Sequence, residues 1–165
     1  MESMSQDRPK YSEESIVQRL GLTYGIYRGC HCGPNIQMMS SLYTYQKSNW
    51  RGWYEADFLF ITKSGYLWEI EIKISIQDFR ADLRKKYYHD HPDVRGFYYC
   101  MPYTIYEAHR EEVKSVCKEK GAGLYILDRY GGLEILIKPK ERKDVPPLDI
   151  YEKIEYLKLF AKKWI

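Results

Sequence analysis

The chain has 165 residues, of which 44% are hydrophobic, and its formal net charge is +3. The hydrophobic content argues against a disordered protein, and the longest wholly apolar run, 58–61, is far too short to cross a membrane. So small a net charge does not by itself indicate nucleic-acid binding, and a polyanion would have to be bound by a local patch. We expect one folded domain over 1–165, because no repeat or linker divides the chain.

The first ten residues contain no apolar stretch that could act as a signal peptide. We therefore expect a cytoplasmic protein. In that compartment the four cysteines should be free thiols.

A first helix is expected after Ser12, whose hydroxyl can cap it. Glu13 lies in its first turn, where an acidic side chain favours the helix dipole. The buried side of this helix is predicted to consist of Ile16, Val17 and Leu20. The following residues, 21–34, show no clean period and are expected to be irregular, with a strand over 37–45.

Two segments with a period of two, 55–62 and 66–75, are separated by Lys63-Ser64-Gly65 and predict a β-hairpin. In a three-residue hairpin loop the last residue adopts the left-handed conformation, and here that residue is Gly65. This turn fixes the register of the two strands. On one face it pairs Phe60 with Trp68, Phe58 with Ile70 and Ala56 with Ile72; on the other it pairs Leu59 with Glu69, Asp57 with Glu71 and Glu55 with Lys73.

The rest of the chain alternates between helical and strand patterns. We expect a helix over 77–87 capped by Ser75, a strand over 96–100, a helix over 105–120, and strands over 124–128 and 133–137. A final amphipathic helix over 150–164 is predicted from the spacing of Ile150, Ile154, Leu157, Ala161 and Trp164. We expect this stripe to pack on the core, and the alternative is a partner surface through which the protein would form a homodimer.

The predicted register places Asp57 directly opposite Glu71. Two like charges so close destabilise a sheet unless a cation lies between them, and Mg²⁺ prefers such oxygen ligands. Lys73 lies on the same face, where its ammonium could orient water or offset charge on a phosphate. The alternative is an ordinary half-exposed strand, on which Glu69, Glu71 and Lys73 face solvent.

Asp57, the Glu71-Ile-Lys73 triplet and the hairpin between them resemble the signature of the PD-(D/E)XK nucleases. The run 71–85 is similar to the MmcB-like branch, a group associated with DNA repair, in which the lysine strand leads into a Ser-capped helix bearing Asp-Phe-Arg-x-Asp-x-x-Lys. The segments 97–102 and 121–128 also lie where that branch continues its core.

The resemblance implies an α/β fold with a restriction-endonuclease-like core, a mixed β-sheet flanked by α-helices. It implies that Asp57 and Glu71 bind Mg²⁺, with Mn²⁺ as a substitute, and that Lys73 is the catalytic lysine. The implied activity is hydrolysis of phosphodiester bonds in DNA, in repair, recombination or the processing of phage or mobile-element DNA. A protein with this activity would associate with the nucleoid when bound to DNA.

The chain departs from the family pattern at several positions. Ala56 stands where the family usually has Pro, and 22–50 and the last helix have no counterpart. Many nucleases of this type add a glutamate from the first helix, for which Glu13 is the candidate, although a solvated helix start also explains it. Glu69 is a further candidate ligand in place of Glu71.

Basic and aromatic residues next to the hairpin are candidates for nucleic-acid contacts. The basic group on the helix after the lysine strand consists of Arg80, Arg84, Lys85 and Lys86. The alternative for this group is a solvated helix face paired internally, for example Asp82 with Lys86. Arg51 and Trp53 belong to the 50–54 segment, whose aromatic rings could stack on bases or be buried.

For two further motifs a structural role is the favoured interpretation. Cys30-His31-Cys32 lacks the spacing of structural zinc pairs. His89-Asp90-His91 could join a metal site or contact phosphate, but a polar loop after a helix is the favoured interpretation. The sequence thus favours a Mg²⁺-dependent nuclease, and the alternative is a non-catalytic DNA-repair accessory protein with the same fold.

Overall fold

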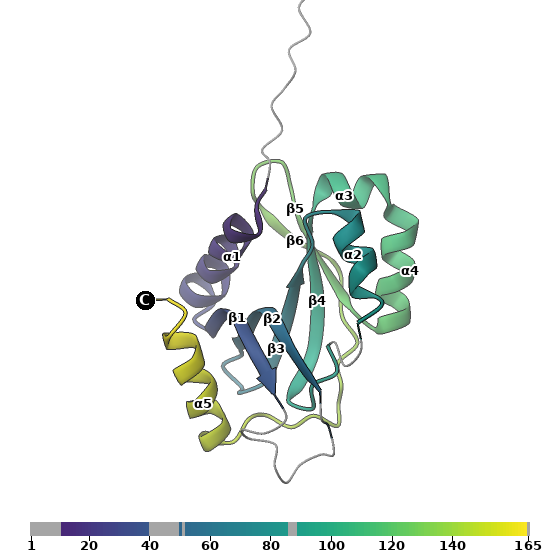
Figure 1. Ribbon diagram of the computed structural model, residues 1–165. Coiled ribbons are helices and arrows are strands. Elements are labelled where there is room, and N and C mark those ends of the chain that lie inside the picture. Colours follow the sequence, from purple (N-terminus) through teal and green to yellow (C-terminus); the bar gives the residue numbers. More distant parts are fainter. Residues whose placement is uncertain (1–10, 40–49, 51, 86–88, 165) are drawn as a thin grey trace, which may run out of the picture.

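The structure is a computed structural model and describes residues 11–39, 50, 52–85 and 89–164. Its elements are α1 (Glu13–Gly21), the π-helix η1 (Leu22–Tyr27), β1 (His31–Met39), β2 (Trp53–Ile61), β3 (Leu67–Ile72), α2 (Ile76–Asp82), β4 (Val94–Pro102), α3 (Tyr103–Ala108), α4 (Arg110–Lys120), β5 (Gly123–Leu127), β6 (Leu133–Ile137) and α5 (Ile150–Ala161). Figure 1 shows the strands between α1 and α5 on one side of the view and α2, α3 and α4 on the other. Among the described residues, no helix is both long and apolar enough to cross a membrane.

The six strands form one mixed sheet in the order β1-β2-β3-β4-β5-β6. The pairs β1–β2, β2–β3 and β5–β6 are antiparallel, whereas β3–β4 and β4–β5 are parallel. Parallel neighbours need a crossover, and these are supplied by α2 and by α3 with α4. The predicted α/β class, with a mixed sheet flanked by helices, is therefore confirmed. The carboxyl ends of β3, β4 and β5 lie at one edge of the sheet.

The predicted hairpin and its register are confirmed over the paired residues. Leu59 pairs with Glu69 and Phe60 with Trp68. The turn closes with a hydrogen bond from the Gly65 amide to the Thr62 carbonyl, 2.9 Å long. Gly65 has a φ of 88°, the left-handed conformation that the turn requires.

The apolar side chains gather in three buried clusters. One joins α1 and η1 to the sheet and contains the predicted helix residues Ile16, Val17 and Leu20. A second lies between the sheet and α2, α3 and α4, around Phe79 and Tyr99. The third lies under α5, where Tyr156 and Phe160 pack with residues of β1 and β2. The helix cap predicted at Ser12 is also present, as a capping box with Ser15.

The region expected to be irregular is ordered instead. The helix continues as η1, and β1 begins at His31 rather than at 37. The sequence hides this strand because Gly33 and Pro34 interrupt its pattern, yet β1 is an edge strand, where proline is tolerated. The absence of a side chain at Gly33 is needed, because a Cβ there would lie 2.6 Å from the Phe160 ring. Of the strand expected over 37–45, residues 40–45 lie outside the described residues.

Two predicted helices are shorter than expected. The helix expected over 105–120 is divided into α3 and α4 at His109, whose φ of −135° and ψ of 32° are not helical. The helix expected over 77–87 ends at Asp82, and Leu83, directly after it, is 37% exposed. Residues 86 and 87 of the expected range lie outside the described residues.

The predicted buried stripe of the last helix is wrong for Ile150 and Ile154, although Leu157 packs against the cluster under α5. The buried residues of α5 are Glu152, Tyr156 and Phe160, whereas Ile150 is 63% exposed and Ile154 41% exposed. The reason is a polar anchor, because the Tyr156 hydroxyl donates to Asp93 at 2.9 Å and turns that side of the helix inward. The predicted stripe therefore lies mainly on the outer side of α5.

Candidate metal centre

Asp57 lies where the hairpin opens. The backbone pairs of β2 and β3 run from Ile61–Leu67 to Phe58–Ile70, one position short of the predicted Asp57–Glu71 pair. In place of a backbone bond, the Asp57 carboxylate accepts a hydrogen bond of 2.8 Å from the Ile72 amide. The side chain is therefore held against β3 next to Glu71, although the paired register itself ends before these two residues.

Lys73 follows β3 and is fixed at both its backbone and its side chain. Its amide donates to the carbonyl of Cys100 on β4, 2.9 Å away. Its ammonium lies 2.9 Å from Glu71 and 3.2 Å from Asp82, the last residue of α2. Glu71 is 1% exposed and Lys73 is 2% exposed. The alternative of a half-exposed strand with Glu71 and Lys73 facing solvent is therefore wrong.

The carboxylates beside β3 repel one another and are poorly solvated. Burial, the charge of Glu71 and more weakly that of Glu13 raise the pKa of Asp57 to about 8. Burial also raises the pKa of Glu71. Burial lowers the pKa of Lys73, but the charges of Glu71 and Asp82 outweigh it and the pKa is raised overall. A buried cation next to two carboxyl groups that resist ionisation is a setting that a divalent ion would relieve.

Glu13 lies in the first turn of α1 and is exposed. Its effect on the pKa of Asp57 places its charge in the neighbourhood of the site. The charge of Glu13, the predicted additional acid of the first helix, thus acts weakly on Asp57 of β2.

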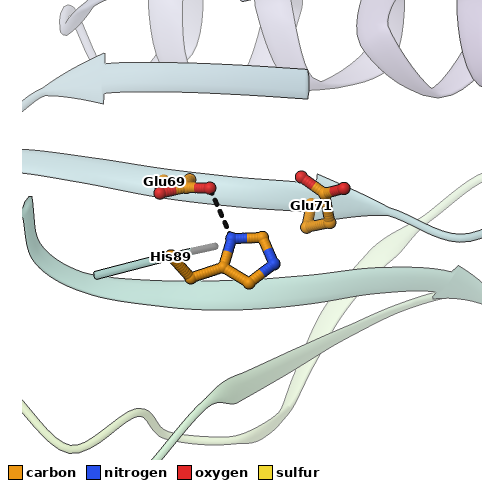
Figure 2. Close-up of side chains that lie close together, drawn as sticks. All are labelled: Glu69, Glu71 and His89. Atoms are coloured by element: carbon orange, nitrogen blue, oxygen red, sulfur yellow. Dashed lines mark hydrogen bonds and ion pairs between the residues drawn. The ribbon is translucent and has the colours of Figure 1, made fainter. Parts of the chain in front are cut away.

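Glu69 is fully buried and belongs to a second set of contacts. It accepts hydrogen bonds from the Tyr54 hydroxyl at 2.7 Å and from His89 Nδ1 at 2.5 Å. Figure 2 shows the His89 ring lying against β3, with Nδ1 directed at Glu69 and Glu71 beside it on the same strand. The other ring nitrogen, Nε2, lies 3.0 Å from Asp82.

Asp82 connects the two sets of contacts. One of its oxygens faces Lys73, and the other accepts from His89 and, at 2.8 Å, from the Tyr99 hydroxyl. Burial would raise the pKa of Asp82, but the hydrogen bond and charge of His89 lower it to about 2. Burial would lower the pKa of His89, but the charge of Glu69 and the bonds to both carboxylates raise it to about 9. His89 is therefore cationic at neutral pH.

Two groupings could hold an ion. Asp57 and Glu71 form the predicted pair. Ligand atoms of Glu69, Glu71 and His89 also lie within 4.8 Å of one another. Both ring nitrogens of His89 are already engaged, by Glu69 and Asp82, and these contacts favour Asp57 and Glu71 as the ion-binding pair.

The residues predicted to contact nucleic acid differ in their exposure and in their partners. The guanidinium of Arg80 is bound to Glu112 of α4 by hydrogen bonds of 2.7 and 2.8 Å, so the internal-pairing alternative holds for this residue. Arg84 and Lys85 are exposed beyond α2, and Trp53 is 62% exposed on β2. Arg51 and Lys86 lie outside the described residues.

Sequence reasoning missed part of the site and the burial of one loop. Tyr54, Asp82 and Tyr99 were not predicted as site residues, and a metal site at His89 was only the less favoured alternative. His89-Asp90-His91 is a loop, as expected, but both histidines are buried, with His89 6% exposed and His91 2% exposed. The available sequence signal was two histidines spaced by one residue shortly before a strand. The φ of 63° at His89 is a feature that no sequence pattern reveals.

The four cysteines are free thiols, as expected. His31 and Cys32 are consecutive residues of β1 and so point to opposite faces of the sheet, which prevents them from binding one ion together.

No protein-family model matches the chain, and none of the curated proteins matches it. Among solved structures, the chain is similar to the SPO1766 protein of unknown function from Silicibacter pomeroyi. The sequence identity is 17%, 90% of this chain and 81% of that chain are covered, and the TM-score is 0.49. This similarity says nothing about what either protein does.

Proposed function

We propose that the protein is a metal-dependent nuclease that hydrolyses phosphodiester bonds in DNA, with a restriction-endonuclease-like core. The observation that carries the proposal is the burial of Glu71 and Lys73 in direct contact beside Asp57. Burying charges without a partner is costly. A fold that keeps all three at one strand end has a use for them beyond stability.

The charges of the site support a divalent cation. Among the described residues, the site brings together five carboxyl groups, those of Asp57, Glu69, Glu71, Asp78 and Asp82, and three cationic groups, those of Lys73, Lys85 and His89. Full ionisation would leave an excess charge of about −2, which Mg²⁺ or Mn²⁺ matches. The single positive charge of His89 offsets only one of the two negative charges of Glu69 and Asp82, so the excess is shared by the cluster, which includes Asp57 and Glu71.

The residues have separate roles in this proposal. Asp57 and Glu71 would hold the ion, which when bound offsets charge on a phosphate oxygen and activates water for attack on phosphorus. Lys73 remains charged because of its carboxylate neighbours. Its ammonium, oriented by Glu71, stabilises negative charge that develops on the phosphate.

The substrate would approach from the side of Asp57. This residue is only partly buried, whereas Glu71 and Lys73 are almost inaccessible. Trp53 is exposed on the same strand as Asp57 and is available to contact DNA. With DNA as its partner, the protein would be cytoplasmic and would associate with the nucleoid.

Cleavage of labelled DNA tests the proposal. Purified protein is incubated with single-stranded, duplex and branched DNA in Mg²⁺ or Mn²⁺, and we expect cleavage of at least one substrate that EDTA abolishes. Asp57→Asn keeps the oxygen that accepts from Ile72 and should lose cleavage while staying folded. Lys73→Ala should also lose it, and Lys63→Ala, in the exposed hairpin turn, is the matched control. Absence of cleavage by the wild-type protein would overturn the nuclease proposal.

The second candidate is a non-catalytic DNA-repair accessory protein. It is favoured by the near-complete burial of Lys73, which is held among three carboxylates. This candidate predicts salt-dependent DNA binding without cleavage in any metal. Binding that survives Asp57→Asn and EDTA, together with intact DNA, would support it.

A further inference from the structure

The buried His89 is in contact with the centre but outside the residues that the proposed reaction uses. Its two ring nitrogens face different carboxylates, Glu69 at 2.5 Å and Asp82 at 3.0 Å. The ring also stacks on Phe97, with a centroid distance of 4.6 Å and an interplanar angle of 14°. Three contacts in three directions fix the imidazole in position and orientation.

The backbone of His89 is also constrained. Its φ of 63° is uncommon for a residue other than glycine. Such a conformation persists where the surroundings determine it. Here the buried contacts to Glu69, Asp82 and Phe97 hold His89 in this conformation.

The contacts of His89 continue to the proposed catalytic lysine. Asp82 Oδ2 is bound by His89 and Tyr99, which leaves Oδ1 directed at the Lys73 ammonium, 3.2 Å away. Lys73 in turn donates to Glu71 at 2.9 Å. A chain of contacts therefore leads from His89 through Asp82 to Lys73.

We infer that His89 is a positioning residue of the metal centre: it orients Asp82, which aims the Lys73 ammonium, and it binds Glu69 so that Asp57 and Glu71 remain the ion ligands. This inference rests on the proposed nuclease function. It assigns His89 a role through hydrogen bonds and not as a ligand, although its nitrogens lie within reach of an ion at Glu69 and Glu71.

Two substitutions separate the two contacts of the ring. The amide of asparagine lies near the position of Nδ1, so His89→Asn keeps a group that can bond Glu69 but loses Asp82. Asparagine also tolerates a positive φ. The longer glutamine reaches the position of Nε2, so His89→Gln keeps the contact to Asp82. The matched control is His91→Gln, which changes the other buried histidine of the same segment.

The expected results are specific to the chain of contacts. At saturating Mn²⁺, His89→Asn should lower the single-turnover cleavage rate about 10- to 100-fold, as is usual when a partner of a metal-site residue is lost. His89→Gln should retain a larger share of the rate than His89→Asn. Asp82→Asn should slow cleavage similarly, and adding it to His89→Asn should cause little further loss, because both changes break one chain.

Mn²⁺ binding without substrate completes the experiment. Isothermal titration should give affinities within about threefold of wild type for the His89 variants and His91→Gln, and a loss of more than tenfold for Asp57→Asn. Loss of Mn²⁺ binding in both His89 variants would make His89 a ligand and overturn the inference. Equal cleavage rates for His89→Asn, His89→Gln and wild type would also overturn it. A wild-type protein that cleaves nothing overturns the proposed function instead, and the titration still decides whether His89 is a ligand.

Discussion

At the scale of single residues, Asp57 takes part in one stabilising and one destabilising interaction. Its carboxylate satisfies the Ile72 amide, yet its charge lies close to Glu71 in a poorly solvated place. Residues in such a position are retained for function at a cost in stability. Removing the charge should therefore make the protein more stable and less active.

We predict that Asp57→Asn raises the free energy of unfolding in a pH-dependent way. The pKa of Asp57 is about 8 in the folded protein against 3.8 as its ordinary value, so the unfolded chain releases its proton first as the pH rises. The wild-type protein therefore loses stability between about pH 4 and pH 8, and the variant does not lose this part. We expect the difference to grow over that range to about 1–3 kcal/mol. Urea unfolding at pH 5 and pH 8 measures it, and a variant less stable than wild type at pH 8 would contradict the prediction.

Divalent ions should also reduce the difference in unfolding free energy between the wild-type protein and Asp57→Asn, because they stabilise the wild-type protein. If Mg²⁺ binds between Asp57 and Glu71, it stabilises the folded protein alone, by about 2.7 kcal/mol at a concentration one hundred times its Kd. Thermal unfolding at pH 8 should therefore show a higher Tm with Mg²⁺ than with EDTA for the wild-type protein. Asp57→Asn should show no such shift, and an equal shift in both proteins would place the ion elsewhere.

At the scale of elements, the hairpin is the part that the sequence predicts best. Period-two patterning and the chemistry of the turn agree on one register, so Asp57 and Glu71 could be placed side by side without a structure. The chemistry of Asp82 and His89 could not be foreseen, because their contacts depend on how α2 and the segment before β4 fold back onto β3. Such tertiary contacts leave no periodic signal in the sequence.

The turn of this hairpin offers a direct test. We predict that Gly65→Ala lowers the free energy of unfolding by about 1–2 kcal/mol, because alanine is strained at a φ of 88°. Ser64→Ala, in the same exposed turn, is the control and should change it by less than about 0.5 kcal/mol. Equal urea midpoints for Gly65→Ala and wild type would show that the turn carries no such requirement.

The last helix shows how a sequence pattern can mislead. Ile150 and Ile154 have helical spacing, yet the side with Tyr156 and Phe160 is buried because Tyr156 finds a hydrogen-bond partner in Asp93. Hydrophobicity alone predicts that isoleucine is buried in preference to tyrosine. In α5 the hydrogen bond to Asp93 reverses this preference.

Substitutions on the two sides of α5 should differ accordingly. Phe160→Ala removes a buried ring and should cost about 3–5 kcal/mol. Ile154→Ala, on the outer side, should cost less than about 1 kcal/mol in a monomer. Thermal and urea unfolding measure both, and a large effect of Ile154→Ala that depends on protein concentration would support the proposed homodimer through this helix.

At the scale of the whole molecule, the class of the fold was predictable because strands and helices alternate along the chain. The order of six strands was not, since β1 is concealed by Gly33 and Pro34 and is completed only by pairing with β2. The site lies where the two kinds of pairing meet, with the antiparallel hairpin on one side of β3 and the parallel β4 on the other.

That meeting point bears on the order in which the chain folds. A hairpin closed by a short turn forms within about 1–10 μs, whereas the parallel pairing of β3 with β4 must first close the longer loop through α2. We therefore expect a local event to bring Asp57 and Glu71 together, and His89 and Asp82 to reach them only with the slower crossover. In an isolated hairpin water would solvate both carboxylates, so we expect their repulsion to become strong only when α2 and β4 pack onto β3.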